Sequence, residues 1–366
     1  MVMRILVLSW KDMAHPAAGG AEVYTAKITR EWVLAGHEVT WFCAAVRGQP
    51  AEQVLNGVRI VRGGSRFSVF AAARRWYLRQ GKGRFDVIVD EVNTRPFFAS
   101  RWAGETPVIA LIFQVCKEIW RFETPGPVAL LGRHVLEPYW LRLYRDVPTL
   151  TISESSRDSL SDYGLRRVEI VPVGVPDLER PDVEREAQPT VLFVGRLAEN
   201  KRPAAALEAF RLLRAQLPEA QMWVIGDGPQ RDELKAKAPD GVIFHGRVDE
   251  ETKHQLMARA HALVVTSVRE GWGLVVDEAA AMGTPSVGYD VAGLRDSVNA
   301  ALGVLVTPTP PALAGVLAQR LPGWVAQPAR VGWSGGATSW EVVAREVLAR
   351  LVLHAGPRLS AAKQVD

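Results

Sequence analysis

Cysteine is nearly absent from this sequence of 366 residues, which contains two, Cys43 and Cys116. They lie far apart and lack the close spacing of metal-ligand or redox pairs. We therefore expect two small buried residues in a reducing cytoplasm and no structural disulfide. Long hydrophobic runs are also missing. No apolar stretch approaches the roughly 18–20 residues of a membrane span, so we expect no transmembrane helix.

Acidic residues are missing from one stretch of the first half. Residues 53–85 contain none, but they hold many arginines and lysines interleaved with aromatic residues. A basic, aromatic helical segment at 59–84 can lie on an anionic membrane surface or bind an anionic acceptor. The alternative is a solvated helix face whose long side chains cover apolar neighbours. The net charge of +4 is modest and does not indicate nucleic acid. We expect a cytoplasmic protein with possible peripheral membrane contact through residues 59–84.

Short β-branched runs alternate with segments of helical period, which predicts parallel sheets covered by helices on both faces. In the first helix, Tyr24, Ile28 and Trp32 share one stripe, and Gly36 follows as a cap. The other predicted helices are 204–217, 230–237, 250–260, 274–282 and 340–353. The predicted strands are 4–8, 38–43, 59–61, 86–89, 107–112, 149–152 and 168–171 in the first half, and 190–194, 221–225, 241–244, 262–265 and 285–288 in the second.

The length fits two domains, and the alternation restarts once along the chain. We predict an α/β protein of two doubly wound domains, 1–172 and 190–338. Residues 173–189 are rich in proline and charge and predict an interdomain linker. A last helix at 339–354 precedes a tail, 355–366, that we expect to be disordered. Ligands of such sheets bind at the carboxyl ends of the strands, so two such edges that face each other would form a cleft.

Each half opens with a strand followed by residues suited to a phosphate. Gly19 and Gly20 precede the first helix, where unpaired amides and the helix dipole favour an anion. This is not the GxGxxG pattern of dinucleotide enzymes, and a tight turn is the alternative interpretation. In the second half, Gly195 ends the strand, and Arg196 and Lys201 follow it. Both cations could neutralise a diphosphate without a metal, unless they are only surface charges.

The stretch TSVREGWGLVVDEAAAMGTPSVGYD at 266–290 places two carboxylates around a glycine-rich turn. Eight helical steps would leave Glu270 and Glu278 on different faces, so we place Glu270 in the loop and Glu278 inside the helix that begins after Gly273. The amides of Leu274 and Val275 would then point at phosphates, with the carboxylates accepting hydrogen bonds from hydroxyls. A loop that merely enters a helix is the alternative.

Five motifs occur in one order along the chain: GGAE (19–22), FVGRLAENK (193–201), VIGDGP (224–229), FHGRV (244–248) and EGWGLVVDEAAAMGTP (270–285). With them the sequence resembles the retaining, nucleotide-sugar-dependent glycosyltransferases of family 4, which have the GT-B fold. The resemblance spans nearly the whole chain. It implies that two Rossmann-like domains face each other across a cleft, the first binding the acceptor and the second the donor. The donor implied is a UDP or GDP sugar, without cofactor or metal.

The resemblance also implies roles for single residues. Arg196 and Lys201 would bind the donor diphosphate with an amide of Gly20, Glu278 the ribose hydroxyls, and Glu270 the donor sugar. The other donor-binding residues that it implies are Gly19, Gly195, Gly226, Asp227, Val248 at the base, Gly271, Trp272, Gly273, Leu274 and Val275.

One departure from the family pattern concerns the sugar pocket. Many relatives have a histidine at the end of the fifth strand of the first domain, where this sequence has Phe113 followed by Gln114. His15 and His134 are uncertain substitutes. We expect Phe113 to present an apolar face to the sugar and to determine specificity, with Gln114 supplying a polar contact. Packing is the alternative role of Phe113.

These observations predict transfer of a sugar to a small-molecule, lipid-linked or glycan acceptor, with the leaving phosphate accepting the acceptor's proton. A covalent route through Glu270 is the rival mechanism. A sugar-nucleotide epimerase or phosphorylase could share the fold, and a catalytically degenerate nucleotide-sugar-binding module is the non-enzyme alternative.

Overall fold

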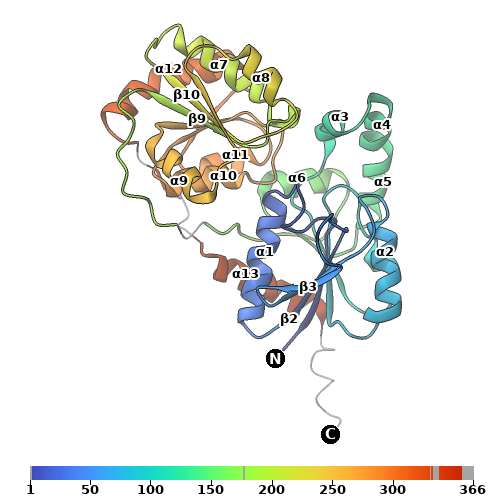
Figure 1. Ribbon diagram of the computed structural model, residues 1–366. Coiled ribbons are helices and arrows are strands. Elements are labelled where there is room, and N and C mark those ends of the chain that lie inside the picture. Colours follow the sequence, from blue (N-terminus) through green and yellow to red (C-terminus); the bar gives the residue numbers. More distant parts are fainter. Residues whose placement is uncertain (1, 176–177, 330, 333–337, 357–366) are drawn as a thin grey trace. The chain divides into compact units, whose positions relative to one another are not determined.

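The computed structural model describes residues 2–175, 178–329, 331–332 and 338–356, and it forms two compact units (Figure 1). The N-terminal unit contains the chain up to Trp120, Gly126–Gly174 and the described residues from Thr338 on. The C-terminal unit contains Arg121–Pro125 and the described part of Val175–Ala337. Each unit is an α/β structure around its own sheet. The binding roles predicted for the two domains stay predictions.

The N-terminal unit is built on a sheet of eight strands in the order β3-β4-β2-β1-β5-β6-β7-β8. All neighbours are parallel except β3, which pairs antiparallel with β4 at one edge. The central strand is buried on both faces: Ile5, Leu6, Val7 and Leu8 are at most 1% exposed. The strands are β1 (Arg4–Leu8), β2 (Glu38–Cys43), β3 (Glu52–Leu55), β4 (Val58–Arg62), β5 (Val87–Glu91), β6 (Val108–Leu111), β7 (Thr149–Thr151) and β8 (Val168–Ile170).

Helices cover this sheet, and two of them come from opposite ends of the chain. In α1 (Gly20–Leu34) the predicted stripe of Tyr24, Ile28 and Trp32 is buried, and Gly36 has a positive φ of 87° after the helix. The last helix, α13 (Trp340–Ala355), packs against α1, and the Trp32 indole donates to the Ala344 carbonyl at 2.8 Å. The other helical elements are α2 (Val69–Trp76), η1 (Tyr77–Gly81), η2 (Ala99–Arg101), η3 (Lys117–Ile119), α3 (Trp120–Glu123), α4 (Gly126–Leu131), η4 (Gly132–Leu136), α5 (Glu137–Arg142) and α6 (Glu154–Asp162).

The C-terminal unit has a six-stranded, wholly parallel sheet in the order β11-β10-β9-β12-β13-β14. Its core lies on both faces of β9. The strands are β9 (Thr190–Val194), β10 (Gln221–Ile225), β11 (Val242–Gly246), β12 (Ala262–Val265), β13 (Ser286–Tyr289) and β14 (Val304–Val306). The helices are η5 (Glu199–Lys201), α7 (Pro203–Arg214), α8 (Arg231–Lys237), α9 (Glu250–Arg259), α10 (Leu274–Ala281), α11 (Leu294–Ala300) and α12 (Pro310–Ala326).

The segment interpreted as a linker packs on the C-terminal unit in its described part. Leu178 and Val183 lie against the apolar core of that unit. Arg185 donates to the Ala260 carbonyl at 3.2 Å and also to the Gly283 carbonyl, and Glu186 pairs with Arg259. The prolines and charges suppress helix and strand there, but the side chains still anchor the backbone to the sheet layer.

Three further expectations can be compared with the structure. Cys43 and Cys116 are both buried, as predicted. None of the helices in the described part of the chain is long and apolar enough to span a bilayer. From residue 357 on, the predicted tail lies outside the described residues.

Within the basic segment, Arg62 is not a surface charge, because it is buried and hydrogen-bonds Asp12 at 2.9 Å.

Candidate functional site in the C-terminal unit

Glycines let the loops at the carboxyl edge of the second sheet lie backbone against backbone. Gly195 follows β9, and its amide donates to the Ile225 carbonyl at 3.0 Å. Gly226, after β10, has a φ of 129°, and a Cβ there would lie 2.0 Å from the Gly195 carbonyl oxygen. Gly228 also leaves no room for a side chain, since a Cβ there would lie 2.4 Å from the Leu197 carbonyl oxygen. The motifs VGR and VIGDGP therefore form one packed surface at the strand ends.

Arg196 and Lys201, which we expected to bind a diphosphate, both lie in the loop between β9 and α7. Arg196 is exposed, and no carboxylate in the described part of the chain pairs with it. Lys201 ends η5, and its Nζ pairs with Glu270 Oε1, which also accepts from Ser267 Oγ at 2.6 Å. The Glu270 side chain is 15% exposed and Lys201 31%. Two residues that the sequence assigned to different parts of the donor thus form one ion pair.

Two loops hold this ion pair in place. The Thr266 hydroxyl, after β12, donates to the Lys201 carbonyl at 2.9 Å. The Val268 amide donates to the Asn200 carbonyl, also at 2.9 Å. The Glu270 amide bonds the Ala292 carbonyl at 3.0 Å, and a Cβ on Gly293 would lie 2.0 Å from the Glu270 oxygen. The loops after β9, β12 and β13 therefore fix each other.

The glycine-rich turn opens α10 as predicted. Gly273 is the N-cap in a left-handed conformation with φ 99°, and it supplies no side-chain cap. No described group accepts a hydrogen bond from the amides of Leu274 or Val275. Trp272, which follows Gly271, instead donates its indole N–H to Asp277 at 2.6 Å. The first turn of α10 therefore offers two amides and the positive end of the helix dipole to an anion.

Glu278 lies inside α10, as predicted, but it has a partner that the sequence did not indicate. Its Oε2 lies 3.0 Å from the Nζ of Lys253 on α9, which also pairs with Glu250 at 2.8 Å. Burial raises the pKa of Glu278, while Lys253 opposes that shift. Burial alone would lower the pKa of Lys253, but the two carboxylates raise it above its usual value. A charged, mostly buried pair thus stands where the sequence predicted a lone carboxylate.

The remaining predicted residues of the second half border the same edge. Asp227 is exposed, and it accepts from the Gly228 amide at 2.8 Å and lies 3.4 Å from Arg231. Val248 follows β11 and is half-buried against the core. His245, near Val248 in the sequence, has a buried Nε2 without a hydrogen-bond partner among the described residues. Burial lowers the pKa of His245, so a neutral imidazole borders this region.

The predicted residues around the first helix lie in the N-terminal unit. The Gly19 amide donates to Glu22 Oε2 at 2.6 Å, so Glu22 occupies the cap of α1. No described group accepts from the Gly20 amide. Lys11 lies 3.1 Å from the other Glu22 oxygen. His15 accepts from the Ala17 amide at 3.0 Å, and burial lowers its pKa.

Phe113, which the sequence placed in the sugar pocket, is buried. It follows β6, but its ring is 6% exposed and packs edge-on against Tyr24 at 5.2 Å, which in turn packs against Trp340. Its carbonyl accepts from Ser156 at 2.7 Å. Phe113 is therefore a packing residue between β6, α1 and α13. Gln114 differs, because its carboxamide oxygen is buried without a hydrogen-bond partner in the described residues. An unpaired buried oxygen favours a ligand hydroxyl at Gln114.

Two family models match adjoining parts of the chain. "Glycosyltransferase Family 4" matches residues 18–179, and "Glycosyl transferases group 1" matches residues 176–324. Together they cover residues 18–324, which contain the C-terminal sheet and all of the N-terminal sheet except β1. The chain belongs to glycosyltransferase family 4.

Individual relatives agree with this family. A glycogen synthase of Mycobacterium tuberculosis is 27% identical over 345 residues, covering 84% of this chain and 83% of that protein. A D-inositol 3-phosphate glycosyltransferase of Xylanimonas cellulosilytica is 27% identical, and the match covers 79% of this chain and 80% of that protein. A 2-deoxystreptamine N-acetyl-D-glucosaminyltransferase of Streptomyces fradiae is 31% identical over shorter parts, 47% of this chain and 45% of that protein.

Solved structures of low sequence identity share the fold of this family-4 glycosyltransferase. A sucrose-phosphate synthase from Thermosynechococcus elongatus superposes with a TM-score of 0.69 at 20% identity, covering 99% of this chain and 98% of that one. WaaG, a glycosyltransferase involved in lipopolysaccharide biosynthesis, superposes with a TM-score of 0.69 at 18% identity, covering 98% of each chain. The GT-B fold with two Rossmann-like domains, predicted from the motifs, is confirmed.

Sequence reasoning missed two polar partners in this glycosyltransferase. Lys253 lies in the first turn of α9 and pairs with Glu250 as well as with Glu278. Ser267 follows β12 and donates to Glu270. Both act across elements that are distant in sequence, and no local pattern signals such contacts.

Proposed function

We propose that this glycosyltransferase binds a nucleoside-diphosphate sugar at the carboxyl edge of its second sheet and transfers the sugar with retention of configuration. The observation that carries the proposal is the Lys201–Glu270 pair beside the uncapped start of α10. An ammonium group has three donors, so Lys201 can bind a phosphate oxygen while it keeps Glu270. The carboxylate then faces sugar hydroxyls, and the cation faces the diphosphate.

In the proposed reaction, the bond between the anomeric carbon and the diphosphate oxygen breaks, and its electron pair stays on the diphosphate. The acceptor hydroxyl forms the new bond on the same face of the sugar, and its proton passes to the leaving phosphate. Arg196, Lys201 and the amides of Leu274 and Val275 would stabilise the negative charge that develops on the diphosphate, so the reaction would need no metal ion. Measuring activity in the presence of a metal chelator tests this point, because a metal-dependent reaction would stop.

The rival covalent route would use Glu270 as the nucleophile. Its Oε1 already accepts from Lys201 and Ser267, and both contacts reduce the electron density that a nucleophile offers. A solved relative in fold, HepE from Anabaena, is described in complex with UDP and glucose, which favours UDP over GDP as the first donor to test. Mass spectrometry of the enzyme with donor alone tests the covalent route, because a sugar adduct on Glu270 would establish it.

The roles of the two glutamates can be separated by calorimetry and turnover. Glu278→Ala should weaken binding of both UDP and UDP-sugar, because the ribose loses its acceptor. Glu270→Ala should leave UDP binding intact while turnover falls, because Lys201 stays and only the sugar loses a contact. Arg196→Ala should cost about 2–4 kcal/mol of transition-state stabilisation. Equal loss of UDP affinity in both glutamate variants would contradict the assignment. UDP binding without any donor turnover in the wild type would point to a binding module instead.

A further inference from the structure

A cavity of about 490 Å³ lies in the N-terminal unit, beside the basic helix α2. Its walls come from α2, from the loop that follows β5, and from α5, so elements distant in sequence meet there. The side chains that line it include three arginines and six aromatic residues, among them Arg74, Arg95, Arg101, Phe70, Trp102 and Tyr139.

The arginines of this cavity are available for a ligand. In the part of the chain that the structure describes, no carboxylate pairs with Arg74, Arg95 or Arg101. Arg95 lies over the ring of Phe70, 4.7 Å from its centroid, which holds a guanidinium at the aromatic wall. Guanidinium groups bind phosphate and carboxylate groups through paired hydrogen bonds. The cavity thus combines anion donors with an apolar wall.

A buried aspartate of β5 holds the loop that carries Arg95 in place. Asp90, fully buried at the end of β5, accepts from the amides of Phe97 at 3.1 Å and Ala99 at 3.0 Å, and it also accepts from the Tyr144 hydroxyl. Between those two amides, Phe98 adopts a left-handed conformation with φ 56°, which a bulky residue rarely adopts. Such strain persists where the surroundings determine the backbone, and it is found most often at ligand sites.

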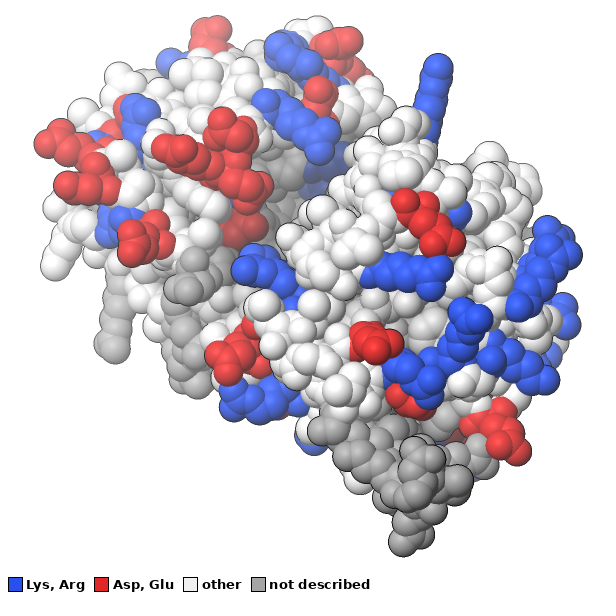
Figure 2. Space-filling view, turned by 60° about the horizontal axis from the view of Figure 1, so that its bottom comes forward, with Lys and Arg blue, Asp and Glu red and all other residues white. Residues whose placement is uncertain are grey.

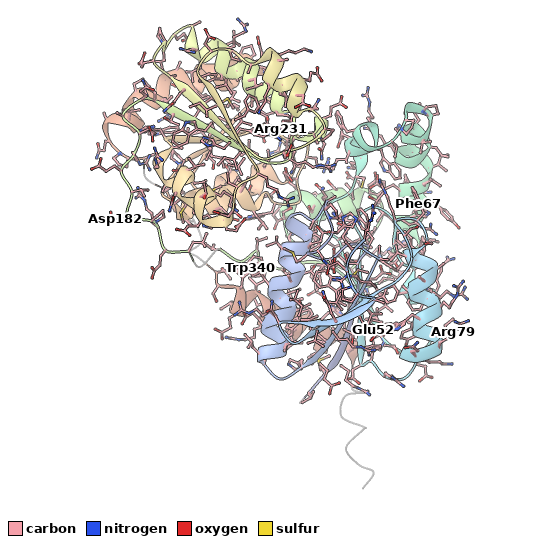
Figure 3. All side chains as sticks on the ribbon, viewed as in Figure 1. Glu52, Phe67, Arg79, Asp182, Arg231 and Trp340 are labelled. Carbon is pink, nitrogen blue, oxygen red and sulfur yellow. The ribbon has the colours of Figure 1, made fainter. Side chains whose placement is uncertain are left out.

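An exposed apolar stripe leads to the cavity along the helical segment α4–η4–α5. Val128, Leu131, Val135 and Tyr139 recur at helical spacing and are 46%, 49%, 54% and 57% exposed. Tyr139 also lines the cavity, so the stripe ends there. Phe67, 81% exposed, projects from the same side of the unit, as does Arg79 of η1 (Figure 3).

The charge of this side matches an acidic surface. Arg74, Arg75 and Arg79 are exposed on consecutive turns of α2 and η1, around Leu78. Figure 2 shows lysine and arginine side chains gathered along the edge of this unit. An apolar helix face beside clustered cations is the arrangement that binds an interface of acyl chains and anionic headgroups.

We propose that this cavity binds the acidic headgroup of an anionic lipid, with the apolar stripe entering the surrounding bilayer. Arg74 and Arg101 hold the headgroup, the aromatic wall contacts its glycerol and acyl portions, and the stripe keeps the enzyme at the membrane.

The first experiment measures sedimentation with vesicles of phosphatidylcholine alone or mixed with phosphatidylglycerol. The wild type should bind only the anionic vesicles, and Arg74→Gln with Arg101→Gln should weaken that binding about 25-fold, at roughly fivefold per arginine. The matched control is Arg30→Gln with Arg47→Gln, two exposed arginines of the same unit outside the cavity. If the control weakens binding as much as the cavity variant, general charge attraction explains the result and the cavity is not the site.

The second experiment separates the lipid from a free anion. Calorimetry with dihexanoyl phosphatidylglycerol below its micelle concentration should show binding that Arg74→Gln with Arg101→Gln abolishes, whereas glycerol phosphate should bind at least tenfold more weakly. Equal binding of both probes would identify a soluble acid as the ligand and overturn the lipid assignment. Leu131→Ser with Val135→Ser should weaken vesicle binding but not binding of the short-chain lipid. Leu34→Ser with Leu353→Ser, 68% and 66% exposed in the same unit, is the control.

UDP binding, measured in the same variants, separates this inference from the proposed function. The cavity variants should bind UDP as the wild type does, because the predicted donor residues lie in the other unit. Wild-type vesicle binding in the cavity variants, with normal UDP binding, would overturn the lipid inference alone. Loss of UDP binding in Glu278→Ala with unchanged vesicle binding would support both the proposed function and the lipid inference.

Discussion

At the scale of single residues, the candidate site holds its carboxylates beside cations before any ligand is present. Glu270 is paired with Lys201, and Glu278 with Lys253. Each pair places an ammonium group beside a mostly buried carboxylate, and hydrogen bonds from hydroxyls to an ionised carboxylate are stronger than those to a neutral acceptor. The lysines therefore contribute to recognition of uncharged groups of the donor, although they cannot accept a hydrogen bond from them.

Lys253 should make nucleotide binding insensitive to pH. Burial already raises the pKa of Glu278, and Lys253 opposes this shift. In Lys253→Ala that pKa should rise further, so that Glu278 takes up a proton as the pH falls toward the acid side of neutrality. UDP affinity should then fall on acidification in the variant but not in the wild type. Calorimetry at two pH values measures this, with Lys237→Ala as a control, since Lys237 pairs with Glu233 at the surface. A flat pH profile in Lys253→Ala would remove Lys253 from this role.

Glu91 should make the N-terminal unit less stable at alkaline pH. Burial raises the pKa of Glu91 to about 8, and Glu22 adds to the shift. The folded state therefore binds a proton that the unfolded state releases above the ordinary pKa, so stability falls as the pH rises toward 8. Its partners Ser9 and Thr25 are hydroxyls, so one can donate to the oxygen of an amide and the other can accept from its N–H.

Glu91→Gln should therefore match the wild type near about pH 5 and exceed it by several kcal/mol near about pH 8.5. Urea unfolding at both values measures the difference, and other titrating groups cancel between the two proteins. A constant difference across the range would show that Glu91 is ionised in the folded state throughout.

At the scale of elements, the buried parallel strands could be predicted, because each is a short β-branched run without alternation. The missed elements lack that signal. β3 is an exposed antiparallel edge strand, with Val54 70% exposed, and β14 has three residues. The site was predicted as a set of loops but not as a set of contacts, since Lys253 and Ser267 reach it across the sheet edge. The burial of Phe113 could not be predicted, because the sequence does not show that α13 and α1 close over it.

Gly226 should be a costly glycine of the donor edge to replace. An alanine Cβ would lie 2.0 Å from the Gly195 oxygen, and the φ of 129° is unfavourable for any side chain. Gly226→Ala should destabilise the C-terminal unit by more than about 1 kcal/mol and weaken UDP binding, because the two loops must separate. Gly315→Ala is the control, since it has open space inside α12 and should stabilise by about 0.5–1 kcal/mol. Thermal unfolding of both variants gives the comparison, and a neutral Gly226→Ala would show that the loops separate freely.

At the scale of the whole molecule, the N-terminal unit is completed by a helix from the end of the chain. Trp32 and Tyr24 are each 1% exposed, and α13 contributes Ala344 and Trp340 to their surroundings. A chain that ends at residue 337 should therefore lose the stability of the N-terminal unit while the C-terminal unit still binds UDP. Circular dichroism melting, followed with and without UDP, measures this. A truncated protein with two intact transitions would show that α13 is dispensable.

This arrangement gives the order of synthesis a consequence. A ribosome translates Val175–Ala337, which contains nearly all of the C-terminal unit, before it translates α13. The first unit to be translated is thus the last to be completed, and the indole of Trp32 stays unshielded until α13 is translated. A nascent chain stalled before residue 340 would carry an incomplete N-terminal unit, and chaperones that bind exposed aromatic surface should associate with it.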